Sequence, residues 1–250
     1  MEIPLKQGER IDDLQYKGLR IIQNPKFFCF GIDAVLLANF TEVRRGDRVI
    51  DLGTGTAIIP ILLAGRTMAA EIVGIDIQSD VLEMAGRSLL MNGLEDKVKL
   101  KQVDIRRVEE HLPRRAFDVV VTNPPYKRTG SGIVNPDEPK AISRHEVHCT
   151  IDGVIDAAAY LLKPGGRFYM IHRPERLAEI IYLMKQKGIE PKVLRMVHPS
   201  IYKKANIILI SGTLGGRAFL KVQEPLYVYN QDGSYTDEIN RIYHREDSHG

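Results

Sequence analysis

Residues 48–57 read Arg48-Val49-Ile50-Asp51-Leu52-Gly53-Thr54-Gly55-Thr56-Ala57. The first half is an apolar, β-branched run that predicts a buried strand, and the second half is a loop containing two glycines. In a doubly wound α/β fold a cofactor binds at this point, the carboxyl end of the first strand, because glycines let the backbone approach the ligand closely. We therefore expect Gly53, Thr54 and Gly55 to line a ligand site.

The loop departs from the fingerprint of dinucleotide-binding folds. That fingerprint, G-x-G-x-x-G, ends in a third glycine, and the corresponding residue here is Ile58. Asp51 lies two residues before the first glycine, and its carboxylate suits a ligand with a positively charged amine better than a pyrophosphate. A Gly-x-Gly pair alone is weak evidence, so the interpretation depends on the rest of the chain.

Segments typical of strands and helices alternate from this loop onward. Strands are expected at 49–52, 71–75, 98–101, 118–121, 167–172, 193–197 and 206–211, and helices at 34–40, 58–66, 79–92, 151–162 and 174–187. This alternation predicts a doubly wound, Rossmann-like α/β sheet of seven strands. The last two strands leave no room for a helix between them, so we expect an antiparallel last strand in an otherwise mostly parallel sheet.

Single residues predict where the helices begin and end. Gly31 lets the chain turn, and Asp33 is placed as the N-cap of the helix that follows. Ser79 is expected to cap the helix 79–92, and Gly93 to end it. Residues 163–166, Lys-Pro-Gly-Gly, are expected to separate a helix from the next strand. For Gly31 and Asp33, a role in binding a ligand is an equal alternative to a capped helix that packs on the core.

Two further acids follow the second and third predicted strands. Asp76 comes 25 positions after Asp51, where doubly wound folds place an acceptor for ribose hydroxyls. Asp104 follows the third strand, where its carboxylate could accept a hydrogen bond from an adenine amino group. Each acid taken separately is equally well explained as a solvated turn residue. Three acids at the ends of three successive strands favour a binding site.

The segment Asn123-Pro124-Pro125-Tyr126 follows the fourth predicted strand. The two prolines fix the backbone and have no N–H to donate, so the corner presents the Asn123 side-chain oxygen and the Pro124 carbonyl as acceptors. Together with the Tyr126 ring, two acceptors suit a planar –NH2 group on a conjugated system, bound at both hydrogens and stacked on its face. The alternative is a proline-rich turn with a buried tyrosine.

The chain divides into three parts by its sequence patterns. Residues 1–47 form an N-terminal segment expected to cap the cofactor site, 48–215 the α/β core, and 216–250 a C-terminal extension. Within the core, residues 127–150 have no clear periodicity and contain several glycines and prolines. A loop of that length inside a compact domain is usually functional or disordered, so we interpret it as a substrate loop.

The composition narrows the class of protein. The 250 residues are 44% hydrophobic and 27% charged, as is typical of globular proteins, and no apolar run approaches the length of a membrane helix. The N-terminus lacks the apolar core of a signal peptide. Cys29 and Cys149 have no metal-binding spacing, so we expect a cytoplasmic protein with no metal ion and no membrane partner.

Positive charge is concentrated in the second half of the chain, although the net charge is only +3. Residues 185–204 contain six cations, Lys185, Lys187, Lys192, Arg195, Lys203 and Lys204, against the single acid Glu190. Lys127, Arg128 and Arg144 lie in the substrate loop. We expect Lys127, Arg128, Arg144, Lys203 and Lys204 to contact nucleic-acid phosphates, and a solvated basic surface is the alternative.

Taken together, the strand-end motifs resemble the class I S-adenosylmethionine-dependent methyltransferases. They are the Asp-x-Gly-x-Gly run at 51–55, the acids Asp76 and Asp104, and the segment 123–126, which occurs in members that methylate conjugated nitrogens. The runs 30–38 and 225–229, with Tyr235-Thr236, are similar to the bacterial tRNA1(Val) adenine-37 N6-methyltransferases, which modify the adenine next to the anticodon. The resemblance covers roughly residues 15–243, and it departs at Ala57, where many members have a third glycine.

The resemblance implies roles for residues of this chain. Cofactor-binding residues would be Gly31, Asp33, Asp51, Gly53, Thr54, Gly55, Asp76, Ile77, Asp104, Ile105 and Asn123, and catalytic residues would be Asn123, Pro124, Pro125 and Tyr126. The implied cofactor is S-adenosylmethionine and the implied partner is tRNA. The sequence leaves open whether the protein is a monomer or a homodimer.

Three other functions remain as alternatives. One is N5-methylation of a release-factor glutamine, but enzymes of that kind have a sizeable helical domain before the core, and only 47 residues precede Arg48 here. Another is guanine N2 methylation of ribosomal RNA. The third is a cofactor- or RNA-binding module without catalysis, which would have no need of the acceptor pair at Asn123 and Pro124.

Overall fold

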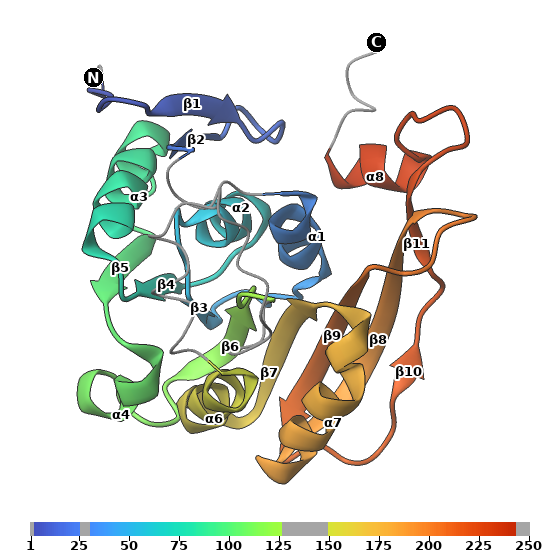
Figure 1. The fold of residues 1–250 in the computed structure, drawn as a ribbon. Coiled ribbons are helices and arrows are strands. Elements are labelled where there is room, and N and C mark those ends of the chain that lie inside the picture. The colour runs from blue at the N-terminus through green and yellow to red at the C-terminus, as the bar shows by residue number, and fades with distance from the viewer. Residues whose placement is uncertain (1–2, 26–30, 127–149, 244–250) are drawn as a thin grey trace, which may run out of the picture.

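A mixed β-sheet with helices on both faces organises the chain (Figure 1). The structure is a computed structural model that describes residues 3–25, 31–126 and 150–243. The strands of the sheet are β3 (Arg48–Leu52), β4 (Glu71–Asp76), β5 (Val98–Gln102), β6 (Phe117–Thr122), β7 (Leu162–His172), β8 (Ile189–Ser200), β9 (Ile207–Leu214), β10 (Lys221–Val222) and β11 (Leu226–Tyr229).

The sheet has the strand order β10-β8-β9-β7-β6-β3-β4-β5. Strands β5, β4, β3, β6 and β7 are parallel, and β9 is antiparallel to both of its neighbours, β7 and β8. The predicted doubly wound sheet with an antiparallel last strand is thereby confirmed. The segment after residue 215 adds β10 and β11 in parallel to the outer edge of β8, so the sheet has nine strands among the described residues.

Helices cover both faces of the sheet. One face carries α1 (Ile32–Phe40), α2 (Ile58–Arg66), α3 (Ser79–Asn92) and α8 (Asp237–Ile242), and the other carries α4 (Val108–His111), α6 (Ile151–Leu161) and α7 (Leu177–Gln186). Short 3-10 helices at Ile105–Arg107 (η1) and Pro174–Arg176 (η2) precede α4 and α7. Within β6, Val119 and Val121 pack in one core and Val120 in the other, so the strand is apolar on both faces.

Two predicted helix caps are wrong, and one helix end is confirmed. The N-cap of α1 is Gly31, and Asp33 lies in the first turn of that helix without capping it. The N-cap of α3 is Gln78, and no side chain caps that helix. Gly93 ends α3 at a φ of +63°. A glycine signal depends on the backbone alone, whereas Asp33 and Ser79 also need their side chains to turn back onto the helix.

The predicted break at residues 163–166 is also wrong. Strand β7 begins at Leu162, directly after α6 ends at Leu161. Phe117 pairs with Leu162 and Val119 with Arg167, so the Lys-Pro-Gly-Gly segment forms a bulge within the strand pairing and not a separate loop. A bulge accepts proline and glycine because its extra residues do not join the hydrogen-bond ladder.

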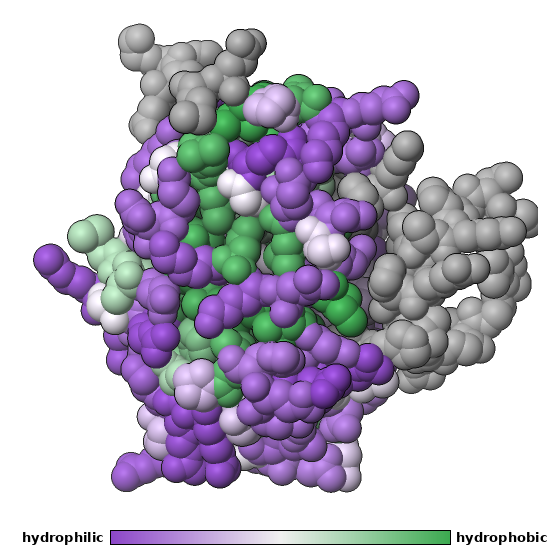
Figure 2. All heavy atoms as spheres, turned by 90° about the vertical axis from the view of Figure 1, so that its left-hand side faces the viewer, coloured by the Kyte–Doolittle hydropathy of each residue, from purple (hydrophilic) through white to green (hydrophobic). Residues whose placement is uncertain are grey.

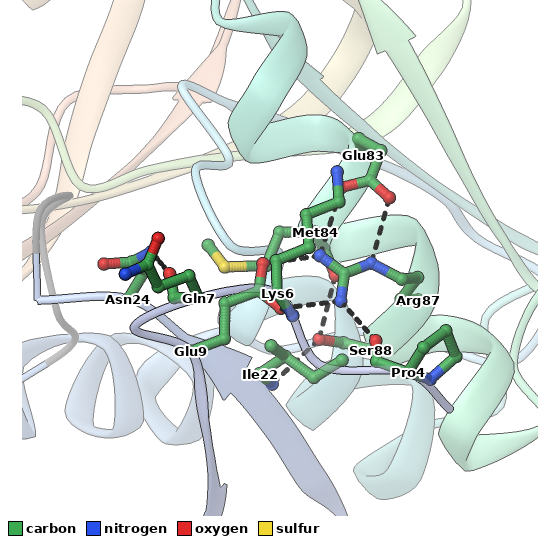
Figure 3. A network of polar contacts seen from close by, with 10 residues as sticks. All are labelled: Pro4, Lys6, Gln7, Glu9, Ile22, Asn24, Glu83, Met84, Arg87 and Ser88. Carbon is green, nitrogen blue, oxygen red and sulfur yellow. Dashed lines mark hydrogen bonds and ion pairs between the residues drawn. The ribbon is translucent and has the colours of Figure 1, made fainter. Parts of the chain in front are cut away.

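The N-terminal segment is held on α3 by a network of polar contacts (Figure 3). Its antiparallel hairpin, β1 (Arg10–Asp13) and β2 (Arg20–Gln23), packs beside that helix. Arg87 of α3 makes an ion pair with Glu9 at 2.5 Å and donates to the Pro4 carbonyl at 2.9 Å. Only 4% of the Glu9 side chain is exposed, and its hydrogen bond with Arg87 holds the pKa of the carboxyl below its usual range.

Strand β5 forms one edge of the sheet, and its polar residues face solvent. Lys99, Lys101 and Gln102 are exposed, and charged side chains on an edge strand oppose pairing with another chain. Figure 2 looks onto this side of the molecule and shows hydrophobic side chains in its middle, surrounded by hydrophilic ones. The opposite edge, at β8, is covered by β10 and β11.

Candidate active site

The loop after β3 is tied to the end of β4 by backbone hydrogen bonds. The N–H groups of Gly53 and Thr54 both donate to the Ile75 carbonyl, at 2.9 and 2.8 Å, and the Gly55 N–H donates to Asp76 Oδ2 at 2.9 Å. Gly53 and Gly55 have φ angles of +75° and +53°, which favour glycine. The loop is therefore a fixed element between two parallel strands.

Ala57, the departure from the family pattern, also adopts a left-handed conformation. Its φ is +62°, and it forms the N-cap of α2. A left-handed backbone costs an alanine about 1–2 kcal/mol relative to a right-handed one. The Ala57 side chain is fully buried, so its burial offsets part of this cost. Alanine and glycine differ by one methyl group, but at this position a glycine would be unstrained.

Asp51 lies within β3 and is almost completely buried. Its exposed fraction is 1%, and no described residue hydrogen-bonds to either of its carboxylate oxygens. Burial raises the pKa of the carboxyl to about 7, the neighbouring Thr54 hydroxyl opposes part of this rise, and the negative charge of Asp76 adds to it. A buried acid without a partner is costly unless a ligand or a proton satisfies it, so Asp51 fits a site for a group that donates hydrogen bonds.

The two other predicted acids already accept hydrogen bonds within the protein. Asp76 is 7% exposed, and it accepts from the Gly55 N–H and, at 3.0 Å, from the Gln78 N–H. A carboxylate has about four acceptor positions, so Asp76 retains capacity for ligand hydroxyls. Asp104 caps η1 and pairs with Arg106, which lowers the pKa of the Asp104 carboxyl.

Two predicted isoleucines flank these acids. Ile77 is 44% exposed directly after Asp76. Ile105 is partly buried, and its Cδ1 atom lies 3.9 Å from where a side chain on Gly53 would begin. The structure thus brings the glycine loop, Asp51, Asp76 and Ile105 together at the carboxyl ends of the parallel strands. Gly31 lies at the start of α1, and no described atom lies within 4 Å of where its side chain would begin.

The segment 123–126 leaves β6 beside the glycine loop. Leu52 pairs with Thr122 in the parallel ladder, and the Thr122 hydroxyl donates to the Leu52 carbonyl at 2.9 Å. The predicted acceptor corner and the predicted cofactor loop are therefore the continuations of two adjacent strands. Pro124 is buried, Pro125 is exposed, and Asn123 and Tyr126 are half-buried.

Tyr126 connects the corner to the first helix. Its hydroxyl lies 2.7 Å from Asp33 Oδ2 and 3.0 Å from Asn123 Oδ1, and both are acceptors. Burial and the neighbouring Asp33 carboxylate raise the pKa of Tyr126, so the hydroxyl keeps its proton. One hydroxyl has one hydrogen to donate, and the charged carboxylate is the stronger acceptor. Asp33, predicted as a helix cap, therefore holds Tyr126 of the 123–126 corner from 93 residues away.

Two residues that the sequence did not predict, His172 and Arg173, complete the corner at the end of β7. The His172 ring packs edge-on against Tyr126, with ring centroids 5.1 Å apart, and the Arg173 guanidinium lies 4.8 Å above the Tyr126 ring. Strand 167–172 was predicted, and its carboxyl end lies on the same side of the sheet as those of β3 and β6. The position of His172 and Arg173 at the end of this strand could have identified them as candidate site residues.

His172 is fully buried and neutral. Its Nδ1 accepts from the Arg173 backbone N–H at 2.7 Å, so the proton of the neutral ring is on Nε2. Nε2 has no hydrogen-bond partner among the described residues. Burial, with the neighbouring Arg176 charge, lowers the pKa of His172 to about 4.

The predicted RNA-binding residues fall into two groups. Lys203 and Lys204 are exposed in the turn between β8 and β9. That turn is linked to the corner, because Arg173 Nη1 donates to the Asn206 carbonyl at 2.9 Å. Lys127, Arg128 and Arg144, like Cys29 and Cys149, lie outside the described residues, so these predictions remain untested.

A family model of the methyltransferase domain matches residues 44–213. The chain belongs to this family. A tRNA1(Val) (adenine(37)-N6)-methyltransferase of Tolumonas auensis is 25% identical to this methyltransferase over 225 residues, which cover 90% of this chain and 92% of the relative. One of the same name from Dyadobacter fermentans is 27% identical over 203 residues, covering 80% and 82%. The resemblance predicted from the strand-end motifs is thereby confirmed.

Solved structures share the fold of this methyltransferase. A predicted O-methyltransferase from Agrobacterium tumefaciens superimposes with a TM-score of 0.70 at 24% identity, covering 85% of this chain and 95% of the other. TrmN from Thermus thermophilus superimposes with a TM-score of 0.52 at 21% identity, covering 72% and 48%. In the described part of the chain, no helix has the length and apolar character needed to cross a membrane.

Proposed function

We propose that this methyltransferase transfers a methyl group from S-adenosylmethionine to N6 of an adenine in tRNA, the adenine 3′ to the anticodon of tRNA(Val). The observation that carries the proposal is the adjacency of β3 and β6, whose ends place an acceptor corner beside a glycine loop. The names of the relatives support the choice of RNA and nucleotide. Release-factor glutamine and ribosomal guanine remain the alternative substrates.

The residues present fit S-adenosylmethionine. Asp51 offers two buried oxygens that no described residue satisfies, which suits the positively charged amine of the methionine part. Gly53, Thr54 and Gly55 would line the same part, Asp76 and Ile77 would hold the ribose and adenine, and Asp104 and Ile105 would contact the adenine. When bound, S-adenosylmethionine supplies an electrophilic methyl group on a sulfonium, so the work of the protein is mostly positioning.

The corner would hold the target amine through its two hydrogens. An adenine amine is a poor nucleophile because its lone pair is delocalised into the ring. Acceptors at Asn123 Oδ1 and the Pro124 carbonyl favour a pyramidal nitrogen, an interaction that strengthens in the transition state. No strong general base is needed, because the methylated ammonium is acidic and loses its proton afterwards.

Asn123 Oδ1 has acceptor capacity left for the base. It lies within hydrogen-bond distance of the Tyr126 hydroxyl, but that hydroxyl has one hydrogen, which Asp33 accepts. Asp33 can keep that hydroxyl while Asn123 turns to the target, because the Asp33 contact is the shorter of the two. An adenine in an RNA loop must be turned out of its stack to reach the corner, and Tyr126 offers a ring on which it can stack.

The test is methylation of unmodified tRNA(Val) by the Asn123→Ala variant. We expect kcat to fall by about 100-fold or more, because the lost contact is made chiefly in the transition state, while the affinity for S-adenosylmethionine changes much less. Asn39→Ala, an exposed asparagine on α1, is the matched control. Mass spectrometry of the product nucleosides separates N6-methyladenosine from N2-methylguanosine. Near-normal kcat in Asn123→Ala would contradict the acceptor mechanism.

A further inference from the structure

The turn between β8 and β9 presents two large apolar side chains to solvent. Ile201 is 59% exposed and Tyr202 is 78% exposed. Single exposed apolar residues are common and need no explanation. Here, however, the exposed pair lies directly beside Lys203 and Lys204, and the turn carries no acidic residue between Pro199 and Asn206.

The Tyr202 ring is held in place although it is exposed. Its hydroxyl accepts from Gln231 Nε2 at 2.8 Å, across from the turn after β11. The turn itself is closed by the Lys203 N–H to the Ser200 carbonyl at 3.0 Å and by the Asn206 N–H to the Val197 carbonyl at 3.1 Å. A ring fixed before binding loses less conformational entropy when a partner stacks on it.

The charge around the ring favours a polyanion. No described residue forms an ion pair with the ammonium groups of Lys203 and Lys204. The acid on the adjoining turn, Asp232, accepts hydrogen bonds from Ser234. A flat ring flanked by lysines combines base stacking with phosphate contact, as single-stranded nucleic acids require.

The turn lies within reach of nucleotides near the target. Arg173 touches both places, because its guanidinium covers the Tyr126 ring and donates to the Asn206 carbonyl. The four-residue step from Asn206 back to Tyr202 spans at most about 14 Å. The Arg173 bridge adds to this distance, with 2.9 Å to the Asn206 carbonyl and 4.8 Å to the Tyr126 ring. Stacked nucleotides of one strand rise by about 3.4 Å each, so Tyr202 is within about seven nucleotides of a base held at the corner.

We infer that Tyr202 is a stacking platform for an unpaired base in the loop that contains the methylated adenine, and that Lys203 and Lys204 bind the phosphates beside it. The inference rests on the proposed function, because it takes a tRNA loop as the partner. Turning the adenine out of the loop leaves other bases of the loop without a stacking partner. The Tyr202 ring offers such a base a surface on which to stack.

The experiment uses the full chain and an unmodified anticodon stem-loop of tRNA(Val). We expect Tyr202→Ala to weaken stem-loop binding and to raise KM by about 5- to 150-fold, with kcat at saturation unchanged, as for the loss of one stacked base. Tyr202→Phe keeps the ring and should remain within a few-fold of wild type. The control is Tyr182→Ala on α7, a tyrosine that is 65% exposed and lies outside the turn.

Abasic stem-loops identify the stacked base. One loop position at a time carries no base, and at the stacked position wild type and Tyr202→Ala should bind equally. The inference is contradicted if wild type methylates the stem-loop but Tyr202→Ala and Tyr182→Ala have the same affinity and KM for every RNA. The exposed surface at Tyr202 would then serve another partner, such as a protein. If wild type neither binds nor methylates the RNA, the proposed function fails and the platform fails with it.

Discussion

The two halves of the site differ in how their polar groups are satisfied. At the ends of β3 and β4, Asp51 is buried and no described residue bonds to its oxygens. At the ends of β6 and β7, the Tyr126 hydroxyl is shared by Asp33 and Asn123, and its ring is covered by Arg173. The first half has an acceptor without a partner, whereas in the second half Asp33 accepts the only hydroxyl hydrogen of Tyr126 and Arg173 lies over its ring.

This difference predicts where substitutions act. A change at the β3–β4 side should alter the binding of the methyl donor, because the loop is already fixed by the Ile75 and Asp76 hydrogen bonds. A change at the β6–β7 side should alter turnover and RNA binding, because those contacts form only with the target. Each side also contains a buried titratable group, Asp51 or His172. Burial disfavours the charged form of both, so it raises the pKa of Asp51 and lowers the pKa of His172.

The largest expected effect is on the pH dependence of stability at Asp51. Its pKa is raised from 3.8 to about 7, so between these values the folded state holds a proton that the unfolded state has lost. Stability from this group is therefore fully present below pH 3.8 and falls by about 4 kcal/mol as pH rises from there to 7. Asp51→Asn should remove that fall, measured by urea unfolding from pH 4 to 8. An unchanged pH slope would show that Asp51 is solvated or paired.

His172 should give the opposite slope. Its pKa is lowered from 6.5 to about 4, so in that window the unfolded state binds a proton that the folded state excludes. Stability is therefore present above pH 6.5 and falls by about 3 kcal/mol as pH decreases towards 4. His172→Asn keeps an acceptor for the Arg173 N–H and cannot titrate. Urea unfolding of the variant should lose this dependence, and a variant that retains it would contradict the assignment.

Asp76→Ala should separate donor binding from turnover. The substitution removes acceptors for the Gly55 and Gln78 N–H groups and, in the proposed cofactor site, for ligand hydroxyls. We expect calorimetry to show S-adenosylmethionine binding weakened by about 1–3 kcal/mol, with kcat at saturating donor much less affected. Asp80→Ala, an exposed acid in the first turn of α3, is the control. Unaltered affinity in Asp76→Ala, or tight NAD binding, would contradict the assigned cofactor.

The smallest expected effect is at Ala57. Replacing it by glycine relieves a left-handed alanine, worth about 1–2 kcal/mol. The same change loses a buried methyl group and adds freedom to the unfolded chain, each worth about 0.5–1 kcal/mol. These contributions nearly cancel, so the free energy of unfolding of Ala57→Gly should stay within about 0.5 kcal/mol of wild type. A gain above about 2 kcal/mol would show that backbone strain dominates at this loop.

Much of the fold was predictable because its signals are local. The alternation of apolar strands with helices gave the order of the elements, and Gly93 gave the end of α3 from its backbone preference alone. The predictions that were wrong needed longer-range information. The caps at Asp33 and Ser79 and the break at 163–166 each depended on what the segment meets after folding.

The sequence by itself determined the strand-end chemistry of this protein. Asp51, Gly53, Asp76 and the segment 123–126 lie near one another because parallel strands end on the same side of the sheet, a consequence of chain topology. Only the tertiary structure decided which of these groups already have partners. The Asp33–Tyr126 contact joins residues 93 positions apart, and the Arg173–Asn206 contact joins residues 33 positions apart. No periodicity or motif encodes such contacts, since they depend on how the helices and turns pack around the edge.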